Sequence, residues 1–98
     1  MEYMHRGREN VSSLTASVGF TSTYLPATDT KVRFAVIQAI DGNIRFRVDG
    51  SAPTSSAGMR LLKDSSVEIW GARDMTNFRC IDDGGTANLE VNYYGEGG

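Results

Sequence analysis

Apolar and polar residues alternate along most of this chain, which is the pattern of β-strands rather than of helices. The clearest alternation runs over residues 43–48, where Ile44, Phe46 and Val48 are separated by arginines, and residues 86–94 alternate in the same way. No stretch keeps apolar residues at helical spacing over three turns, and eleven glycines interrupt the chain. The pattern therefore predicts an all-β protein.

Seven segments carry this pattern, separated by the turn-forming residues Gly, Asp, Asn and Ser. In chain order they are 11–18, 31–40, 43–48, 59–62, 67–70, 78–81 and 86–94. The first is the weakest because it is rich in Ser and Thr. This number and spacing of strands predict a small antiparallel β-sandwich or jelly roll with seven to nine strands. Its expected core is Ile37, Ile44, Phe46, Val48, Leu61, Ile69, Phe78, Leu89 and Val91.

The chain of 98 residues is expected to form one domain. Residues 1–30 are predicted to be an N-terminal arm followed by the weak first strand, and residues 31–98 the β-sandwich core. Within the first part, Met1–Asn10 is polar and shows no strand periodicity. We expect this arm to become ordered over neighbouring molecules, as disordered segments do on binding.

The dipeptide Asp41-Gly42 predicts a tight hairpin between segments 31–40 and 43–48. A two-residue turn sets Ile37 opposite Phe46, whereas a three-residue loop would exchange the two faces of the hairpin. Hydrophobicity slightly favours the second register, but Asp-Gly favours the first, which we adopt. The other face then needs a cover, from the second sheet, the arm or a neighbouring subunit, because it mixes apolar groups with arginines: Phe34, Val36, Ile40, Arg45 and Arg47.

Composition narrows the function classes. Ten Lys and Arg against twelve Asp and Glu give a net charge of −2, which argues against nucleic-acid binding. The longest apolar run, Phe34–Ile40, is too short to span a bilayer. The N-terminus lacks the charged-then-apolar layout of a secretion signal, so synthesis in the cytoplasm is expected. The single cysteine cannot form an internal disulfide.

Few residues offer catalytic or metal-binding chemistry. His5 is the only histidine and lies in the polar arm, and Cys80 lies in an apolar run where cysteine packs as a small hydrophobe. Asp82-Asp83 could attract calcium, but the Gly-Gly that follows favours a turn. We therefore predict no enzyme activity, no metal and no cofactor.

Three aromatic residues, Trp70, Tyr93 and Tyr94, raise the possibility of a sugar-stacking platform. In a small β protein such residues belong more often to the core and its rim, so a carbohydrate-binding module is kept only as the lesser alternative.

Residues 31–94 resemble small β-sandwich proteins encoded among the virion structural genes of tailed bacteriophages. The resemblance is carried by the alternating strand IRFR, by DGSAPTSSAGMRLLKDSS, by MTNFRCI and by the final GTANLEVNYY. It implies a non-enzymatic virion protein, made in the host cytoplasm, that acts as a capsid decoration or cement protein. A tail-, connector- or fibre-associated role is the alternative.

The resemblance also implies the partners: a major capsid protein or other virion proteins, with the chain itself a homo-oligomer. Gly50–Gly58 has no charge and no large side chain, so it could approach a flat partner closely, and it is otherwise expected to be a connection that crosses between sheets. Partner contacts are expected from the arm, the mixed hairpin face and this loop: Arg6, Arg8, Phe34, Val36, Arg45, Arg47, Ser51, Pro53, Thr54 and Ser55.

Overall fold

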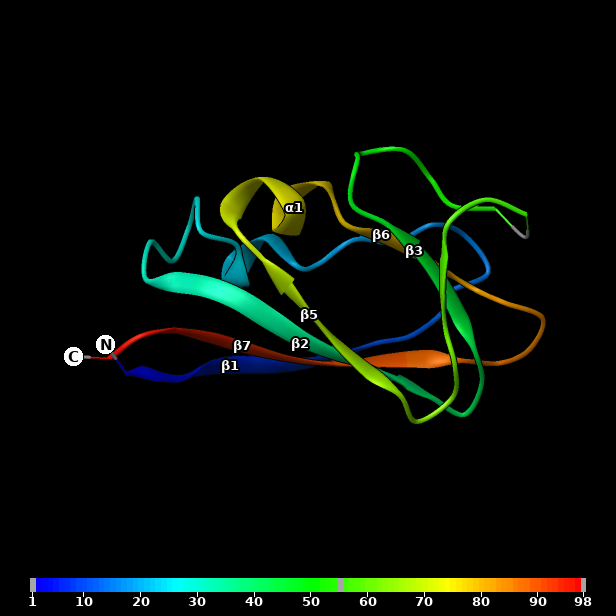
Figure 1. Ribbon diagram of the computed structural model, residues 1–98, viewed down its shortest axis with the longest axis horizontal. Coiled ribbons are helices and arrows are strands. Elements are labelled where there is room, and N and C mark those ends of the chain that lie inside the picture. The colour runs from blue at the N-terminus through cyan, green and yellow to red at the C-terminus, as the bar shows by residue number, and fades with distance from the viewer. Residues whose placement is uncertain (1, 55, 98) are drawn as a thin grey trace.

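A computed structural model of the protein describes residues 2–54 and 56–97, which fold into two packed antiparallel sheets (Figure 1). This confirms the predicted all-β class. The strands are β1 (Tyr3–Val11), β2 (Val32–Ile40), β3 (Ile44–Arg47), β4 (Met59–Leu61), β5 (Ser66–Trp70), β6 (Arg79–Asp82) and β7 (Asn88–Glu96). The helical elements are η1 (Ser22–Tyr24) and α1 (Ala72–Asn77). The first sheet has the order β1-β7-β2-β5 and the second the order β4-β3-β6.

The core lies between the two sheets, because one face of each strand alternation points inward. On the first sheet it includes Ile37 and Tyr93, both without solvent exposure, and on the second Ile44 and Phe46. Eight of the nine predicted core residues are buried, and the ninth, Val48, is half-buried against them. Buried residues that the pattern did not predict include Leu14, Val32, Met75 and Tyr93.

The expected hairpin at Asp41-Gly42 is wrong in both registers. β2 pairs with β5 and β7, while β3 pairs with β4 and β6, so the turn carries the chain from one sheet to the other. Of the two turn residues only Asp41 has a positive φ, 63°, whereas a type I′ turn needs two. Ile37 and Phe46 still share the interior, but from opposite sheets.

The loop Gly50–Gly58, in contrast, stays within one sheet. It joins β3 to β4, which are neighbours in one sheet with Phe46 opposite Met59, so the expected crossing between sheets is also wrong. Asp49, just before the loop, accepts a hydrogen bond from the Ser51 backbone N–H through its Oδ1 at 3.1 Å. Thr54 and Ala57 bond each other through their backbones.

The N-terminal segment is part of the first sheet and not an arm. β1 pairs with β7 from Tyr3 to Val11, with one irregularity between His5 and Gly7. Its alternation is hidden in the sequence because the strand has polar residues on both faces. The predicted strand 11–18 is wrong apart from its ends, since Val11 closes β1 and Val18 makes a single bridge to Cys80.

Residues 12–31 close one side of the sandwich, between the edge strands β1 and β6. Leu14 is 2% exposed and belongs to the core. Phe20 stacks on Phe78 with ring centroids 4.2 Å apart, and Tyr24 stacks on Tyr93 at 4.7 Å. The chain therefore fills this side with its own apolar side chains.

Candidate functional site

The outer face of the first sheet carries a cluster of aromatic rings near one end of the molecule. The N- and C-termini lie side by side at that end (Figure 1). The pairing of β2 sets Phe34 between Tyr94 of β7 and Trp70 of β5. Its ring stacks on Trp70 at 4.1 Å and on Tyr94 at 5.2 Å, both nearly parallel. Tyr3 of β1 meets Phe34 and Trp70 edge-on at 5.4 and 5.5 Å. We call these four residues the aromatic strip.

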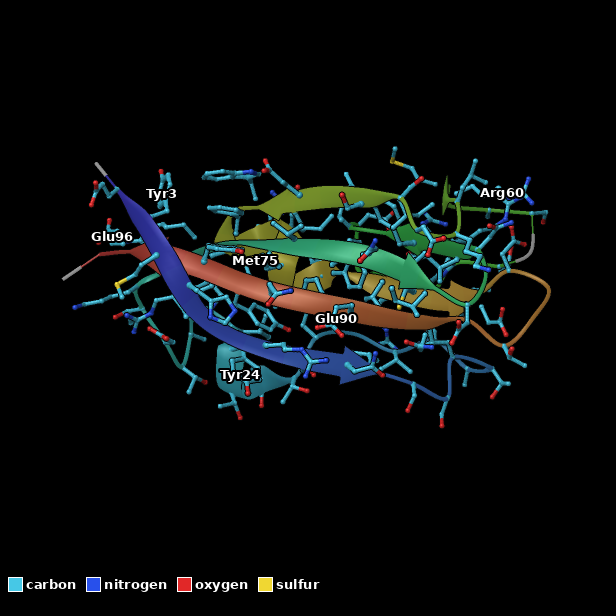
Figure 2. The ribbon with its side chains drawn as sticks, turned by 90° about the horizontal axis from the view of Figure 1, so that it is seen from below. Tyr3, Tyr24, Arg60, Met75, Glu90 and Glu96 are labelled. Atoms are coloured by element: carbon cyan, nitrogen blue, oxygen red, sulfur yellow. The ribbon has the colours of Figure 1, made fainter. Side chains whose placement is uncertain are left out.

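The aromatic strip is exposed at its rim and closed at its centre. Tyr3 is 46% and Trp70 44% exposed, while Phe34 is only 8% exposed. Figure 2 shows Tyr3 beside Glu96 at one end of this face, with Arg60 at the far end of the molecule. Because neighbouring rings cover one another's faces, the strip is a preorganised patch held by stacking.

The expected sugar platform of Trp70, Tyr93 and Tyr94 does not form. Tyr93 points inward and is fully buried, so only the other two reach the outer face. Its hydroxyl donates to the Glu9 carboxylate, which also accepts the Thr21 backbone N–H at 3.1 Å. Burial, and then that carboxylate, raises the pKa of Tyr93.

The remainder of the outer face is polar, and its side chains form hydrogen bonds with side chains of the neighbouring strand. His5 Nε2 lies 2.9 Å from Asn92 Oδ1, and the Arg8 guanidinium donates to Glu90 Oε1 at 2.9 Å. Val36 of β2 is half-buried among these polar rows. This part of the face therefore offers a partner little unsatisfied polarity.

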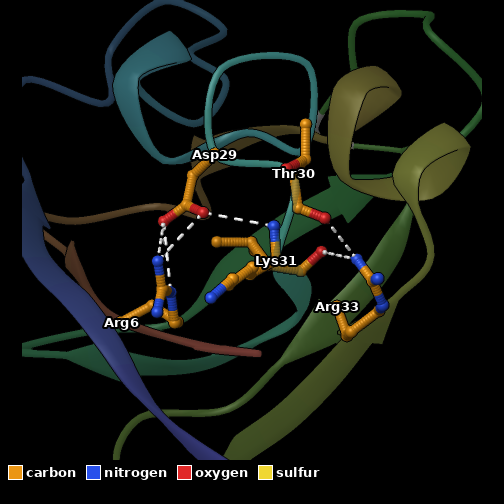
Figure 3. Close-up of polar contacts among 6 residues, drawn as sticks. Arg6, Asp29, Thr30, Lys31 and Arg33 are labelled. Carbon is orange, nitrogen blue, oxygen red and sulfur yellow. Dashed lines mark hydrogen bonds and ion pairs between the residues drawn. The ribbon is translucent and has the colours of Figure 1, made fainter. Parts of the chain in front are cut away.

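Arg6 ties β1 to the turn that precedes β2. Its guanidinium makes hydrogen bonds of 3.1 to 3.2 Å to both carboxylate oxygens of Asp29 (Figure 3). Asp29 Oδ1 also accepts the Lys31 backbone N–H at 3.2 Å, and Arg33 bonds the Thr30 carbonyl at 2.7 Å. The role of Arg6 in this structure is thus an internal one.

The outer face of the second sheet holds arginines that are paired with aspartates. Arg45 and Arg60 both meet the Asp83 carboxylate, at 3.5 and 2.9 Å. Arg47 pairs with Asp49, and its hydrogen bond lowers the pKa of that carboxyl group. These side chains hold the second sheet and its loop together.

The acidic pair Asp82-Asp83 divides its roles. Asp82 Oδ1 accepts the Gly85 backbone N–H at 2.9 Å, as in the predicted turn, while Asp83 faces the two arginines. No group of three or more metal-ligating side chains occurs within residues 2–54 and 56–97.

An apolar groove opens between the sheets at the edge strands β4 and β5. It has a volume of about 300 Å³, and we call it the intersheet groove. Phe46, Val48 and Met59 form its wall on the second sheet, and a neighbouring hollow of about 280 Å³ shares these three residues. The opposite wall comes from β5 and α1: Val67, Glu68, Ile69, Trp70 and Asp74.

Trp70 joins the two surfaces, because it belongs to the aromatic strip and also lines the intersheet groove. Exposed apolar surface therefore continues around the edge strand β5. Met59, which is 67% exposed, carries this surface to the β4 side of the groove. Exposed apolar side chains that gather at a groove are candidates for an interaction site.

The structure does not bring the predicted partner residues together. Phe34 and Val36 belong to the outer face of the first sheet, and Arg45 and Arg47 to that of the second, so the expected mixed face does not exist. Arg6 and Arg8 lie on β1, with Asp29 and Glu90 as partners. Pro53 is buried, Ser51 and Thr54 are exposed in the loop, and Ser55 lies outside the described residues.

Comparisons with known proteins identify no relative of this chain. No protein-family model, curated protein or solved structure matches the chain. In the described part of the chain, no helix is long and apolar enough to cross a membrane. The class defined here is therefore a small two-sheet β-sandwich with an apolar edge surface around β5.

Sequence reasoning missed this surface because its parts come from distant segments. Tyr3 and Trp70 are 67 positions apart, and only the pairing of four strands brings their rings into contact. The sequence did single out Phe34 as a contact residue and Trp70 and Tyr94 as possible platform residues, but nothing in it placed them beside one another or beside Tyr3.

Proposed function

We propose that this protein is a non-enzymatic structural protein of a bacteriophage virion, which decorates the capsid and stabilises the shell. The observation that carries its binding role is the exposed apolar surface around β5, from the aromatic strip to the intersheet groove. The virion setting rests on the resemblance of residues 31–94 to small phage β-sandwich proteins.

The aromatic strip suits such a role on energetic grounds. Stacking holds Trp70 and Tyr3 in place before any partner arrives, so little side-chain entropy is lost on binding. Aromatic residues also dominate the binding energy of protein interfaces. On a shell that offers many equivalent sites, a symmetric oligomer would gain further affinity through multivalency. We therefore propose a homo-oligomer that binds several capsid subunits.

The proposal is tested on particles of the phage whose genome encodes this chain. Density-banded virions, intact heads and separated tails are analysed for the protein by quantitative mass spectrometry. We expect it on heads, in a copy number that matches the shell symmetry, and we expect particles without it to lose their DNA at lower temperature. Its presence on tails alone would transfer the role to a tail, connector or fibre component, and its absence from all banded particles would overturn the virion assignment.

A carbohydrate-binding function is the second candidate, favoured by one feature. Trp70 is exposed beside Glu68 and Asp74 at a groove, and an aromatic ring with neighbouring carboxylates suits a sugar. Against it, one face of the Trp70 ring is covered by Phe34. A glycan array compares the wild type with Trp70→Ala: sugar binding that the substitution abolishes would support this function, and no binding would remove it.

A further inference from the structure

One side of the sandwich shows how this protein fills the space between its sheets. Between β1 and β6, the backbone of Val18 makes hydrogen bonds of 3.0 and 2.9 Å with Cys80 on the edge strand β6. The same segment places Leu14 in the core and stacks Phe20 on Phe78. An irregular segment therefore closes this side: it bridges the edge strand β6 once and places apolar side chains between the sheets.

The opposite side, between β4 and β5, is not closed in this way by the described residues. The intersheet groove lies there, with Phe46 and Met59 on one wall and Ile69 on the other. Met59 opposes the core residue Phe46 across β3 and β4, yet it is 67% exposed. The groove is thus as apolar as the side between β1 and β6, but no segment of the described chain covers it as residues 12–31 cover that side.

The outer edge of β5 leaves backbone groups available beside this groove. Hydrogen bonds from Ala39 N to Ser65 O and from Gly71 N to Arg33 O fix which residues of β5 face β2. Because pairing alternates in an antiparallel ladder, Glu68 and Trp70 direct their N–H and C=O groups away from β2. Within residues 2–54 and 56–97, no backbone hydrogen bond on that side involves either residue.

Charge at the groove points to a cationic partner. Glu68 accepts the Trp70 indole N–H at 2.9 Å, but neither Glu68 nor Asp74 forms an ion pair within the described part of the chain. Both carboxylates line the groove and are exposed to solvent. A Lys or Arg of a partner would complement them.

We propose that the free edge of β5 accepts an extended segment of a partner protein as an added strand. The segment places an apolar side chain in the intersheet groove and a Lys or Arg beside Glu68 and Asp74. Strand addition of this kind takes affinity from backbone hydrogen bonds and specificity from alternate side chains. The inference rests on the proposed binding function and names the surface and the partner chemistry for it.

The test uses the whole protein and a library of random tryptophan-free peptides about a dozen residues long, enough for a strand of ordinary length and its flanks. Selected peptides are expected to alternate apolar residues and to contain Lys or Arg. They should shift the fluorescence of Trp70, the single tryptophan, and protect the Glu68 and Trp70 amides from hydrogen exchange. Replacing both carboxylates, Glu68→Lys and Asp74→Lys, should weaken binding about tenfold or more. The control Glu2→Lys makes the same kind of charge change on an exposed residue before β1, and should leave binding unchanged.

The inference is overturned if no peptide is selected, if the protected amides lie away from β5, or if the Trp70 signal responds to oligosaccharides and to no peptide. These outcomes are separable from the virion test. A protein present on heads that selects no peptide keeps the proposed function and loses this surface. A protein that selects peptides but is absent from particles keeps the surface and loses the virion assignment.

Discussion

Single residues in this protein are held by contacts that reach across the sheets, and Glu9 is an example. It lies on β1 in a polar run, yet it receives hydrogen bonds from the buried Tyr93 hydroxyl and from the Thr21 backbone. A buried hydroxyl is costly unless it is paired, so the half-buried Glu9 carboxylate removes that cost for Tyr93. Glu9 and Arg6 therefore attach β1 to the rest of the protein through Thr21, Tyr93 and Asp29, so this segment is not a solvated arm.

Gly95 is a residue whose lack of a side chain is required. A Cβ at this position would lie 2.0 Å from the Lys31 carbonyl oxygen and 2.9 Å from Val32 Cα, both backbone atoms. We expect Gly95→Ala to lower the free energy of unfolding by about 3 kcal/mol, because the backbone of β2 or β7 must shift.

Urea unfolding of Gly95→Ala and of Gly85→Ala provides the comparison. At Gly85 the nearest atom to an added Cβ is Asp82 Oδ1 at 3.9 Å, so this control should change stability by less than about 0.5 kcal/mol. Equal effects from the two substitutions would show that the close approach at Gly95 does not exist.

Cys80 is expected to make the free energy of unfolding depend on pH in the alkaline range. Burial raises the pKa of its thiol from 9.0 to about 12. Because the thiol pKa is higher in the folded protein than in the unfolded chain, the stability that Cys80 contributes is complete below pH 9. Between pH 9 and about 12 the thiol is ionised in the unfolded chain but not in the folded protein, so this stability is lost as the pH rises. This group should lower the unfolding free energy by up to about 1.4 kcal/mol per pH unit in that window.

The measurement is urea unfolding at several pH values for the wild type and Cys80→Ala. The variant should start less stable but lose less stability than the wild type between pH 9 and 10, the interval below the ordinary pKa of 10.0 for Tyr93. Parallel curves for the two proteins would contradict the assigned burial of the thiol.

At the scale of elements, the connections decide the architecture more than the strands do. Asp41–Asn43 is short and carries the chain between sheets, whereas the long Gly50–Gly58 loop stays within one sheet. An Asp-Gly pair permits a tight hairpin but does not require one, since Asp41 alone takes a positive φ here. Loop length and composition were therefore poor guides to which strands pair.

β1 gives a prediction at this scale. Removing residues 1–10 would remove the backbone hydrogen bonds between β1 and β7 and leave the Tyr93 hydroxyl without its acceptor Glu9. We expect the truncated protein to lose its cooperative thermal transition, measured by circular dichroism. A polar arm that becomes ordered only over neighbouring molecules, as predicted from the sequence, would instead leave this transition unchanged.

A point variant separates the loss of the strand from the loss of one side chain. His5→Ala removes a hydrogen bond to Asn92 and an edge-on contact with the Tyr94 ring, both at an exposed position, and should change stability by less than about 0.5 kcal/mol. An unchanged melt in the truncated protein would mean that β1 contributes nothing to the sandwich.

At the scale of the whole molecule, one side of the sandwich is closed and the opposite side is open. Residues 12–31 fill the side between β1 and β6, and the side between β4 and β5 keeps the intersheet groove. An irregular segment thus supplies part of the core, while regular strands border the open surface. The asymmetry concentrates binding capacity at one edge.

The same substitution on the two sides tests this asymmetry. Leu14 is 2% exposed and Leu62 is 53% exposed. Leu14→Ala should cost about 3 kcal/mol of unfolding free energy, because it leaves a cavity between the sheets, and Leu62→Ala should cost less than about 0.5 kcal/mol.

Denaturant unfolding of both variants gives the two values under the same conditions. A cost for Leu14→Ala as small as that for Leu62→Ala would place residues 12–31 outside the core and restore the predicted division of the chain at residue 30.

The sequence by itself determined the strand content and most of the core, because alternation is a local property that needs no knowledge of the partner strand. Ile44, Phe46 and Leu89 were identified in this way. Alternation also placed Ile37 inward although the assumed hairpin was wrong, since a strand keeps its two faces whatever it pairs with. It failed for β1, whose inward side carries Glu9 instead of an unbroken apolar row.

Only the tertiary structure decided which strands are neighbours, and with them the functional surface. The order β1-β7-β2-β5 sets Tyr3, Tyr94, Phe34 and Trp70 side by side, although they come from four separate segments. The packing of the two sheets then leaves the groove between Met59 and Ile69. Pairing depends on the sum of many weak long-range contacts, so no short stretch of residues encodes it.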